Sequence, residues 1–124
     1  MRRSLAVAVA ACAFAPSLAH AADPVYVRDP LTSKLHQRPH KVNFNDVDLT
    51  GLKWIHWGQA KAIGNGRANV LVCEPNCAGG HRDRGTVRLV LSKRSTDGGK
   101  RVYQCIKGTV KGVPKAYSRI SWGC

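Results

Sequence analysis

Short apolar runs separated by glycine-containing turns constrain the fold of this chain more than any other feature of its sequence. Over residues 86–92 the alternation is strict, with Val87, Leu89 and Leu91 on one face of an expected strand and polar or smaller residues on the other. No window of about 11 residues or more carries a helical period. The pattern predicts an all-β fold, a small antiparallel β-sandwich or barrel of about five to seven strands, stabilised by disulfides.

Glycine-containing segments mark the expected turns between these strands. Gly64-Asn65-Gly66 is typical of a hairpin turn, and so is Asp97-Gly98-Gly99. The candidate strands cover residues 25–27, 52–57, 60–63, 68–73, 86–92, 101–107, 109–113 and 118–122.

A secretory leader is expected at the start of the chain. The basic start Met1-Arg2-Arg3 precedes an uncharged run over residues 5–15, and Ala19-His20-Ala21 supplies a small-x-small cleavage pattern. The apolar run is too short to span a bilayer, which requires about 20 residues. We therefore expect residues 1–21 to be a signal peptide, cleaved between Ala21 and Ala22.

Cys12 allows a second interpretation of this leader. Val9-Ala10-Ala11-Cys12 is similar to a bacterial lipobox, which would make Cys12 a lipid anchor. The short apolar run before Cys12 and the complete cleavage pattern after it argue against lipid anchoring. We expect an exported protein, periplasmic or secreted, in which residues 22–41 form an extended N-terminal arm or edge strand and residues 42–124 form a single β domain.

Four of the five cysteines lie beyond the expected leader, in a chain whose export favours disulfides. Cys73 and Cys77 flank a Pro-Asn pair suited to a tight turn, so we favour a Cys73–Cys77 bond together with Cys105–Cys124. The main alternative is a Cys73–Cys105 cross-strand bond. A zinc or copper site at Cys73, Cys77 and His81 is a further alternative, but oxidation in an exported chain competes with thiolate ligation. We expect no metal and no cofactor.

Two motifs give the chain a resemblance to a group of known proteins. Thr50-Gly51-Leu52-Lys53-Trp54-Ile55-His56-Trp57-Gly58 is followed by Cys73-Glu74-Pro75-Asn76-Cys77-Ala78 and Gly80. The chain thereby resembles small exported bacterial proteins of uncharacterised function, over residues 49–92. The resemblance implies mutual bonding of Cys73 and Cys77, and it implies no known activity. The high positive charge and the additional Cys105 and Cys124 depart from the group's pattern.

Positive charge is the main functional signal. The formal net charge is +13, and 13 Lys and Arg against three acids in residues 61–124 account for +10 of it. The candidate anion-binding residues lie on and beside one expected hairpin. They are Arg82, Arg84, Arg88, Lys93, Arg94, Lys100 and Arg101. If the hairpin forms, its basic pairs Lys93-Arg94 and Lys100-Arg101 lie close together at its tip.

Such a cluster attracts polyanions and accelerates their encounter with the protein. We expect a non-enzymatic binding protein that engages an anionic partner through its C-terminal half: an envelope polymer, a lipid headgroup, nucleic acid or an acidic protein. An inhibitor or immunity-type protein is one alternative. A small secreted nuclease or hydrolase is another, with His56 and His81 as acid and base. The sequence contains no G-x-S-x-G, no H-E-x-x-H and no phosphate-binding loop.

The tryptophans are interpreted mainly as packing residues. Trp54 and Trp57 are three residues apart, which on a strand places them on opposite faces. One indole is then expected in the core, and the other exposed or covered by a neighbouring segment. Trp122 is expected to pack against a Cys105–Cys124 disulfide.

Overall fold

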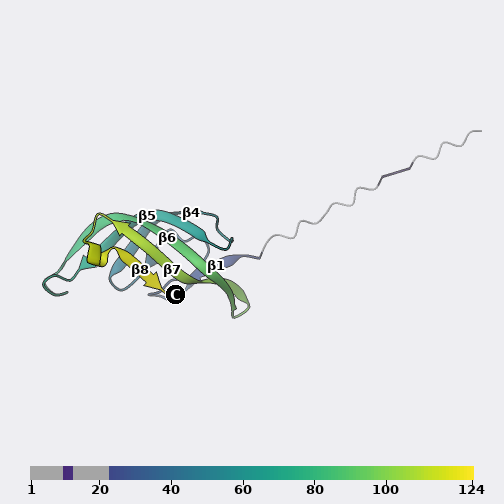
Figure 1. Ribbon diagram of the computed structural model, residues 1–124. Helices are drawn as coiled ribbons and strands as arrows, with labels where there is room; N and C mark the ends of the chain where they lie inside the picture. The colour runs from purple at the N-terminus through teal and green to yellow at the C-terminus, as the bar shows by residue number, and fades with distance from the viewer. Residues whose placement is uncertain (1–9, 13–22) are drawn as a thin grey trace, which may run out of the picture.

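A computed structural model describes residues 10–12 and 23–124 of the chain. The expected cleavage site at Ala21-Ala22 and most of the expected signal peptide lie outside the described residues. Within the described part, eight strands form one sheet and there is no α-helix (Figure 1). The elements are β1 (Val25–Arg28), β2 (Leu35–His36), β3 (Val42–Asn43), β4 (Val47–Ile55), β5 (Ala62–Val72), β6 (His81–Asp97), β7 (Lys100–Lys111), the 3-10 turn η1 (Lys115–Tyr117) and β8 (Arg119–Trp122).

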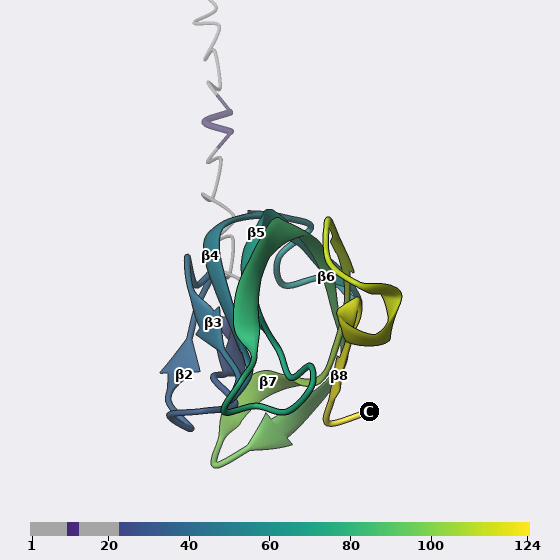
Figure 2. The same ribbon diagram turned by 90° about the vertical axis from the view of Figure 1, so that its left-hand side faces the viewer.

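The sheet has the order β2-β1-β7-β6-β5-β4-β3, and β8 also pairs with β7. It curls into a half-barrel, with β3 and β4 on one side of the curl and β8 on the other (Figure 2). The all-β prediction is therefore confirmed in its barrel-like form, with a single curled sheet in place of two stacked ones. Two of the eight strands, β2 and β3, are only two residues long.

The free side of β7 is shared between β1 and β8. β1 pairs in parallel with Arg101–Tyr103, whereas β8 pairs antiparallel with residues 106–109. Residues 22–41, expected as an arm or edge strand, include both β1 and β2. Because β2 pairs with the outer side of β1, β1 is an internal strand and not an edge strand.

Alternation along β6 builds the centre of the core. Val87, Leu89 and Leu91 are each at most 3% exposed, as the sequence pattern predicts, and they face Ile106 and Val110 of β7. Burying a side chain of this size stabilises a fold by about 1.5–3 kcal/mol. The concave side of the curled sheet is therefore the apolar side, and the convex side carries the alternate residues.

The expected hairpin turn at Gly64-Asn65-Gly66 is wrong, because these residues lie in the middle of β5. Gly64 faces the core directly beneath Trp54, where a Cβ would lie 2.7 Å from the indole ring. A Cβ on Gly66 would likewise lie 2.6 Å from the backbone carbonyl oxygen of Thr50. These glycines permit close packing of strand against side chain, and they do not turn the chain.

Both indoles of the Trp54 and Trp57 pair lie on the core side of the sheet, so the expectation of opposite faces is wrong. β4 ends at Ile55, and His56 has a positive φ of 59°, which reverses the chain after the strand. The two rings then meet edge to face, with centroids 5.0 Å apart. Trp57 also packs against Tyr103, at 5.5 Å, and both indole N–H groups donate to backbone carbonyls.

Asp29 holds the end of β1 against β3. The residue is 4% exposed, and its carboxylate accepts hydrogen bonds from the backbone N–H groups of Leu31, Thr32 and Asn43, at 2.9–3.0 Å. Burial by itself would raise the pKa of Asp29, but the hydrogen bonds from Thr32, Asn43 and Leu31 outweigh it and lower the pKa. The carboxylate thus links the turn after β1 to the edge strand β3.

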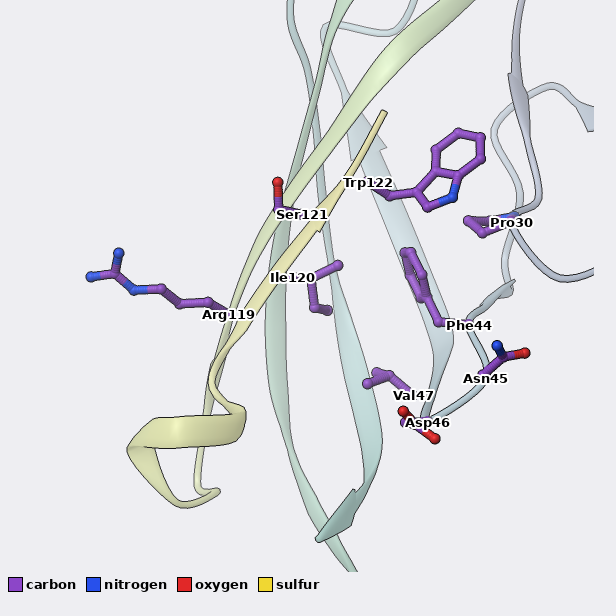
Figure 3. A pocket seen from close by; sticks show the side chains of 9 residues that line it. All are labelled: Pro30, Phe44, Asn45, Asp46, Val47, Arg119, Ile120, Ser121 and Trp122. Carbon is purple, nitrogen blue, oxygen red and sulfur yellow. The ribbon is translucent and has the colours of Figure 1, made fainter. Parts of the chain in front are cut away.

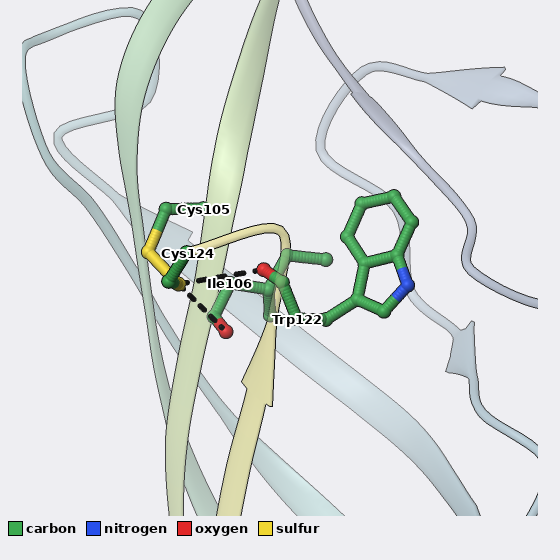
Figure 4. Close-up of a disulfide and its surroundings, with 4 residues drawn as sticks. All are labelled: Cys105, Ile106, Trp122 and Cys124. Carbon is green, nitrogen blue, oxygen red and sulfur yellow. Dashed lines mark hydrogen bonds between the residues drawn. A yellow bond between two sulfur atoms is a disulfide. The ribbon is translucent and has the colours of Figure 1, made fainter.

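Both favoured disulfides are present. Cys73–Cys77 closes the loop between β5 and β6, and Cys105–Cys124 joins the segment after β8 to β7. Trp122 does not pack against the second disulfide: its indole lies on the opposite side of the strands, against the core (Figure 4). The Cys124 sulfur, which carries no hydrogen, lies 3.4 Å from the carbonyl oxygen of Trp122. Cys12 is a free, exposed thiol.

Candidate anion-binding face

The convex face of the sheet is built from cross-strand rows of outward-pointing side chains. β4 contains a β-bulge at Gly51, where φ is 61°. Because the bulge adds one residue to β4, both Thr50 and Lys53 point outward although they are three positions apart, and Lys53 pairs with Asn65. The face is rich in cations and has Asp48 as its acid. Its cations are Lys53, Arg67, Arg82, Arg84, Arg88, Lys107, Lys111 and Arg119.

A hollow of about 700 Å³ lies on this face between β6 and η1. Four exposed cations line it, and we call it the basic groove: Arg88, Lys107, Lys115 and Arg119. Arg88 and Arg119 flank Thr109 in one row, because Thr109 is the register partner of both. Two strand spacings, about 10 Å, separate their backbones. The remaining lining residues are uncharged, and they include Thr109, Ser118 and Ser121.

The four groove cations have no protein partner for their charge. Among residues 23–124, none of their side chains takes part in a hydrogen bond or salt bridge. By contrast, Arg82 lies 3.4 Å from Asp48 on the same face. Like charges that share one face add their potentials, so the groove is an electropositive region open to solvent.

The cations at the hairpin tip are placed differently. The hairpin forms with Gly98-Gly99 as its turn, and Lys100 pairs with Asp97 directly beside it. Lys93-Arg94 lies three to four positions back from Asp97, next to Tyr103 and not at the tip itself. The structure therefore places Lys100-Arg101 at the tip, as predicted, and Lys93-Arg94 further back along β6.

Two of the cations near the tip are already engaged by the protein. Arg94 donates a 2.6 Å hydrogen bond to the carbonyl of Gly58, and the Lys100 ammonium lies 5.1 Å from the centre of the Tyr26 ring. Burial raises the pKa of Tyr103, although the Gly58 N–H and the nearby Arg94 and Arg101 charges oppose this shift. Arg28 binds Asp97 at 2.7 Å, which places a carboxylate among the tip cations.

The seven candidates from the sequence thus divide into two groups. Arg82, Arg84 and Arg88 lie on the convex face, and the other four lie near the tip. Sequence reasoning missed Lys107, Lys115 and Arg119, which join Arg88 in the groove. Lys107 could have been found from the sequence, because it follows the apolar Ile106 in the alternating pattern of β7. Arg119 could not, because it lies in the row of Arg88 only through the pairing of β8 with β7.

A second, smaller hollow of about 320 Å³ lies on the other side of β8. Phe44, Val47, Ile120 and Trp122 form its apolar wall, while Arg119 points away from it (Figure 3). β8 therefore separates a cleft with an apolar wall from the basic groove.

The histidines do not form the acid–base pair of the nuclease alternative. Ile55, which precedes His56, pairs with Ile63, whereas His81 pairs with Val72 at the other end of β5. Nine residues of extended strand separate these positions, or about 30 Å. His81 lies 3.2 Å from Asp83.

The metal alternative also loses its thiolate ligands, because Cys73 and Cys77 are bonded to each other. In the part of the chain that the structure describes, no cluster of three or more His, Cys, Asp or Glu side chains is arranged to hold a metal ion. No helix within residues 10–12 and 23–124 is long and apolar enough to cross a membrane.

Comparison with protein-family models, curated proteins and solved structures finds no match to this chain. The resemblance to small exported bacterial proteins therefore stays a prediction.

Proposed function

We propose that this chain is an exported, non-enzymatic binding protein that engages an anionic partner through the basic groove and the cations around it. The observation that carries the proposal is the groove itself. Arg88, Lys107, Lys115 and Arg119 gather around one hollow without an acidic residue among its lining. Exposed cations without internal partners contribute little to folding and remain free to bind an external anion.

Neighbouring cations extend the site beyond the groove. Arg67 and Lys111 lie in the row next to that of Arg88, each as a register partner of Thr86. Rows on one face of a sheet are about 7 Å apart along the strands. Such an array suits a partner that carries many anionic groups. Two disulfides agree with the proposed export to an oxidising compartment.

Heparin serves as a soluble polyanion for the test. We compare the unmodified protein with a groove variant, Arg88→Ser with Arg119→Ser, and with a tip variant, Lys93→Ser with Arg101→Ser. Both variants lose two positive charges, so their net charges are equal. We expect the groove variant to bind heparin at least about tenfold more weakly at fixed salt, and the tip variant less than about threefold, since contacts to charged groups contribute about 1.5–3 kcal/mol each.

Two outcomes would contradict the proposal. The first is equal weakening in both variants, which would mean that net charge alone determines binding. The second is a retention of the unmodified protein that does not fall with salt, because release of counterions makes polyanion binding strongly salt-dependent.

A further inference from the structure

An apolar strip borders the basic groove on the convex face. Ile55, Ile63 and Val90 are partners in one cross-strand row, so their side chains point to the same side of the sheet. Ile55 is 52% exposed, and the other two are half-buried. The same row continues into Lys107, which is one of the groove cations.

The strip and the cations are close enough for one amphiphilic surface to contact both. Three neighbouring strands span about 10 Å across the strip. The row of Lys53, Arg88 and Arg119 follows about 7 Å along the strands. Apolar and cationic side chains therefore lie side by side on one open face.

Exposure of this kind is unusual in the molecule. Outward positions of a half-buried sheet are normally polar. Among the described residues, the only large apolar side chains that are strongly exposed are Ile55 and Leu31, at 52% and 54%. Leu31 lies in the turn between β1 and β2, outside the rows of the convex face. Ile55 is the one that adjoins the cations.

We infer that the convex face binds the surface of an anionic lipid bilayer, with the groove cations on lipid phosphates and the apolar strip at the boundary of headgroups and acyl chains. The inference rests on the proposed anion-binding function and specifies its partner. A bilayer offers negative charge and aliphatic surface together. A soluble sulfated polymer or nucleic acid leaves the strip without a partner, and the rows of this face contain no aromatic side chain on which bases stack.

Vesicle sedimentation tests the inference with the full-length mature protein. The probes are vesicles of phosphatidylcholine alone and vesicles that also contain about one-third phosphatidylglycerol, and heparin binding is measured in parallel. The test variant is Ile55→Ser. Leu31→Ser is the matched control, because it removes an apolar side chain of the same size and exposure from another region.

We expect binding to the phosphatidylglycerol vesicles and little binding to phosphatidylcholine alone. Ile55→Ser weakens vesicle binding about tenfold, because it removes most of the apolar area of a large side chain from the contact. It leaves heparin binding unchanged, and Leu31→Ser changes neither. Urea unfolding of both variants verifies that they remain folded.

Three results overturn the inference. They are unchanged vesicle binding of Ile55→Ser, equal loss in Leu31→Ser, and no vesicle binding of the unmodified protein, as expected for a soluble polymer or an acidic protein as partner. In each case, groove-dependent heparin binding would leave the proposed anion-binding function standing. Absence of heparin and vesicle binding together would overturn both.

Discussion

The two halves of β7 carry similar numbers of cations but present them differently. The half near the turn has β1 on its free side. There Lys100 of β7 contacts the Tyr26 ring, and Arg94 of the adjacent β6 donates a hydrogen bond to Gly58. The other half has β8 on its free side and lines the basic groove, whose cations make no side-chain hydrogen bond or salt bridge among the described residues. Similar numbers of cations in the sequence therefore have different roles: cations near the turn contact other parts of the protein, and those of the groove remain open to solvent.

The flanking strands of the two halves are also held by different chemistry. A buried carboxylate, Asp29, anchors the end of β1, whereas the Cys105–Cys124 disulfide anchors the chain after β8. The first device depends on pH and the second on oxidation. This difference allows each half to be perturbed separately.

The largest effect is expected from Asp29→Ala, which acts on the half flanked by β1. Three backbone N–H groups lose their buried acceptor, and we expect the free energy of unfolding to fall by about 4 kcal/mol at neutral pH. Because the pKa of Asp29 is lowered in the folded protein, its stabilising contribution is complete above the ordinary carboxyl pKa and decreases as the pH falls through the lowered value. Urea unfolding at neutral and acidic pH measures both effects. A difference between variant and parent that does not shrink in acid would contradict this role.

Removal of the Cys105–Cys124 disulfide acts on the groove half. The double change Cys105→Ser with Cys124→Ser opens a loop of about 18 intervening residues and is expected to cost about 3 kcal/mol in the chain-entropy model. Heparin binding weakens as well, since β8 forms one wall of the groove. The control, Cys73→Ser with Cys77→Ser, opens a much shorter loop far from the groove. It is expected to cost about 2 kcal/mol and to leave heparin binding intact.

Salt dependence separates the two sets of cations. For a short DNA duplex as polyanion probe, each phosphate neutralised contributes about 0.9 to the log–log slope of affinity against salt. Arg88→Ser with Arg119→Ser should therefore reduce the slope by about 2, whereas Lys93→Ser with Arg101→Ser leaves it nearly unchanged. Fluorescence anisotropy over a salt series gives the slopes. Identical slopes in the two variants would place the tip and the groove in one continuous site.

The smallest effect concerns single cations and stability. Arg94→Ala loses the 2.6 Å hydrogen bond to Gly58 and is expected to lower the free energy of unfolding by about 1 kcal/mol. Arg88→Ala removes no hydrogen bond and no salt bridge of the described residues, so its effect is expected to stay within about 0.5 kcal/mol. Thermal or urea unfolding of the two variants makes the comparison. A larger loss for Arg88→Ala would show that the groove cations are structural.

Local patterns predicted much of the fold and only part of the site. The alternation around Val87 identified the buried face of β6, and the Gly98-Gly99 turn identified its hairpin with β7. The turn predicted at Gly64-Asn65-Gly66 was wrong, because a glycine required for close packing and a glycine required for a turn cannot be distinguished in the sequence. The prediction that Trp54 and Trp57 lie on opposite faces was also wrong, because β4 ends two residues before Trp57. The positive φ of His56, which reverses the chain there, carries no distinct sequence signal.

The groove shows why a site can be harder to predict than its fold. Arg88 and Arg119 are far apart in the chain and share a row only because β8 pairs with the second half of β7. Lys93 and Arg94, which were expected in the same cluster and follow Arg88 closely in sequence, lie in a different region. The grouping of charges therefore depends on strand register, which short stretches of sequence do not encode.

By itself, the sequence determined the all-β class and the buried face of the longest strand, and it favoured the two disulfide pairs that the structure contains. These features depend on alternation, on glycine at a turn and on residues near one another in the chain. The tertiary structure decided that β1 joins β7 in parallel, that Gly64 makes room for Trp54, and that four cations meet in one groove beside an apolar strip. Each of these features depends on contacts between segments that are far apart in the chain. Such contacts stabilise the protein only after the sheet has formed and curled around its core.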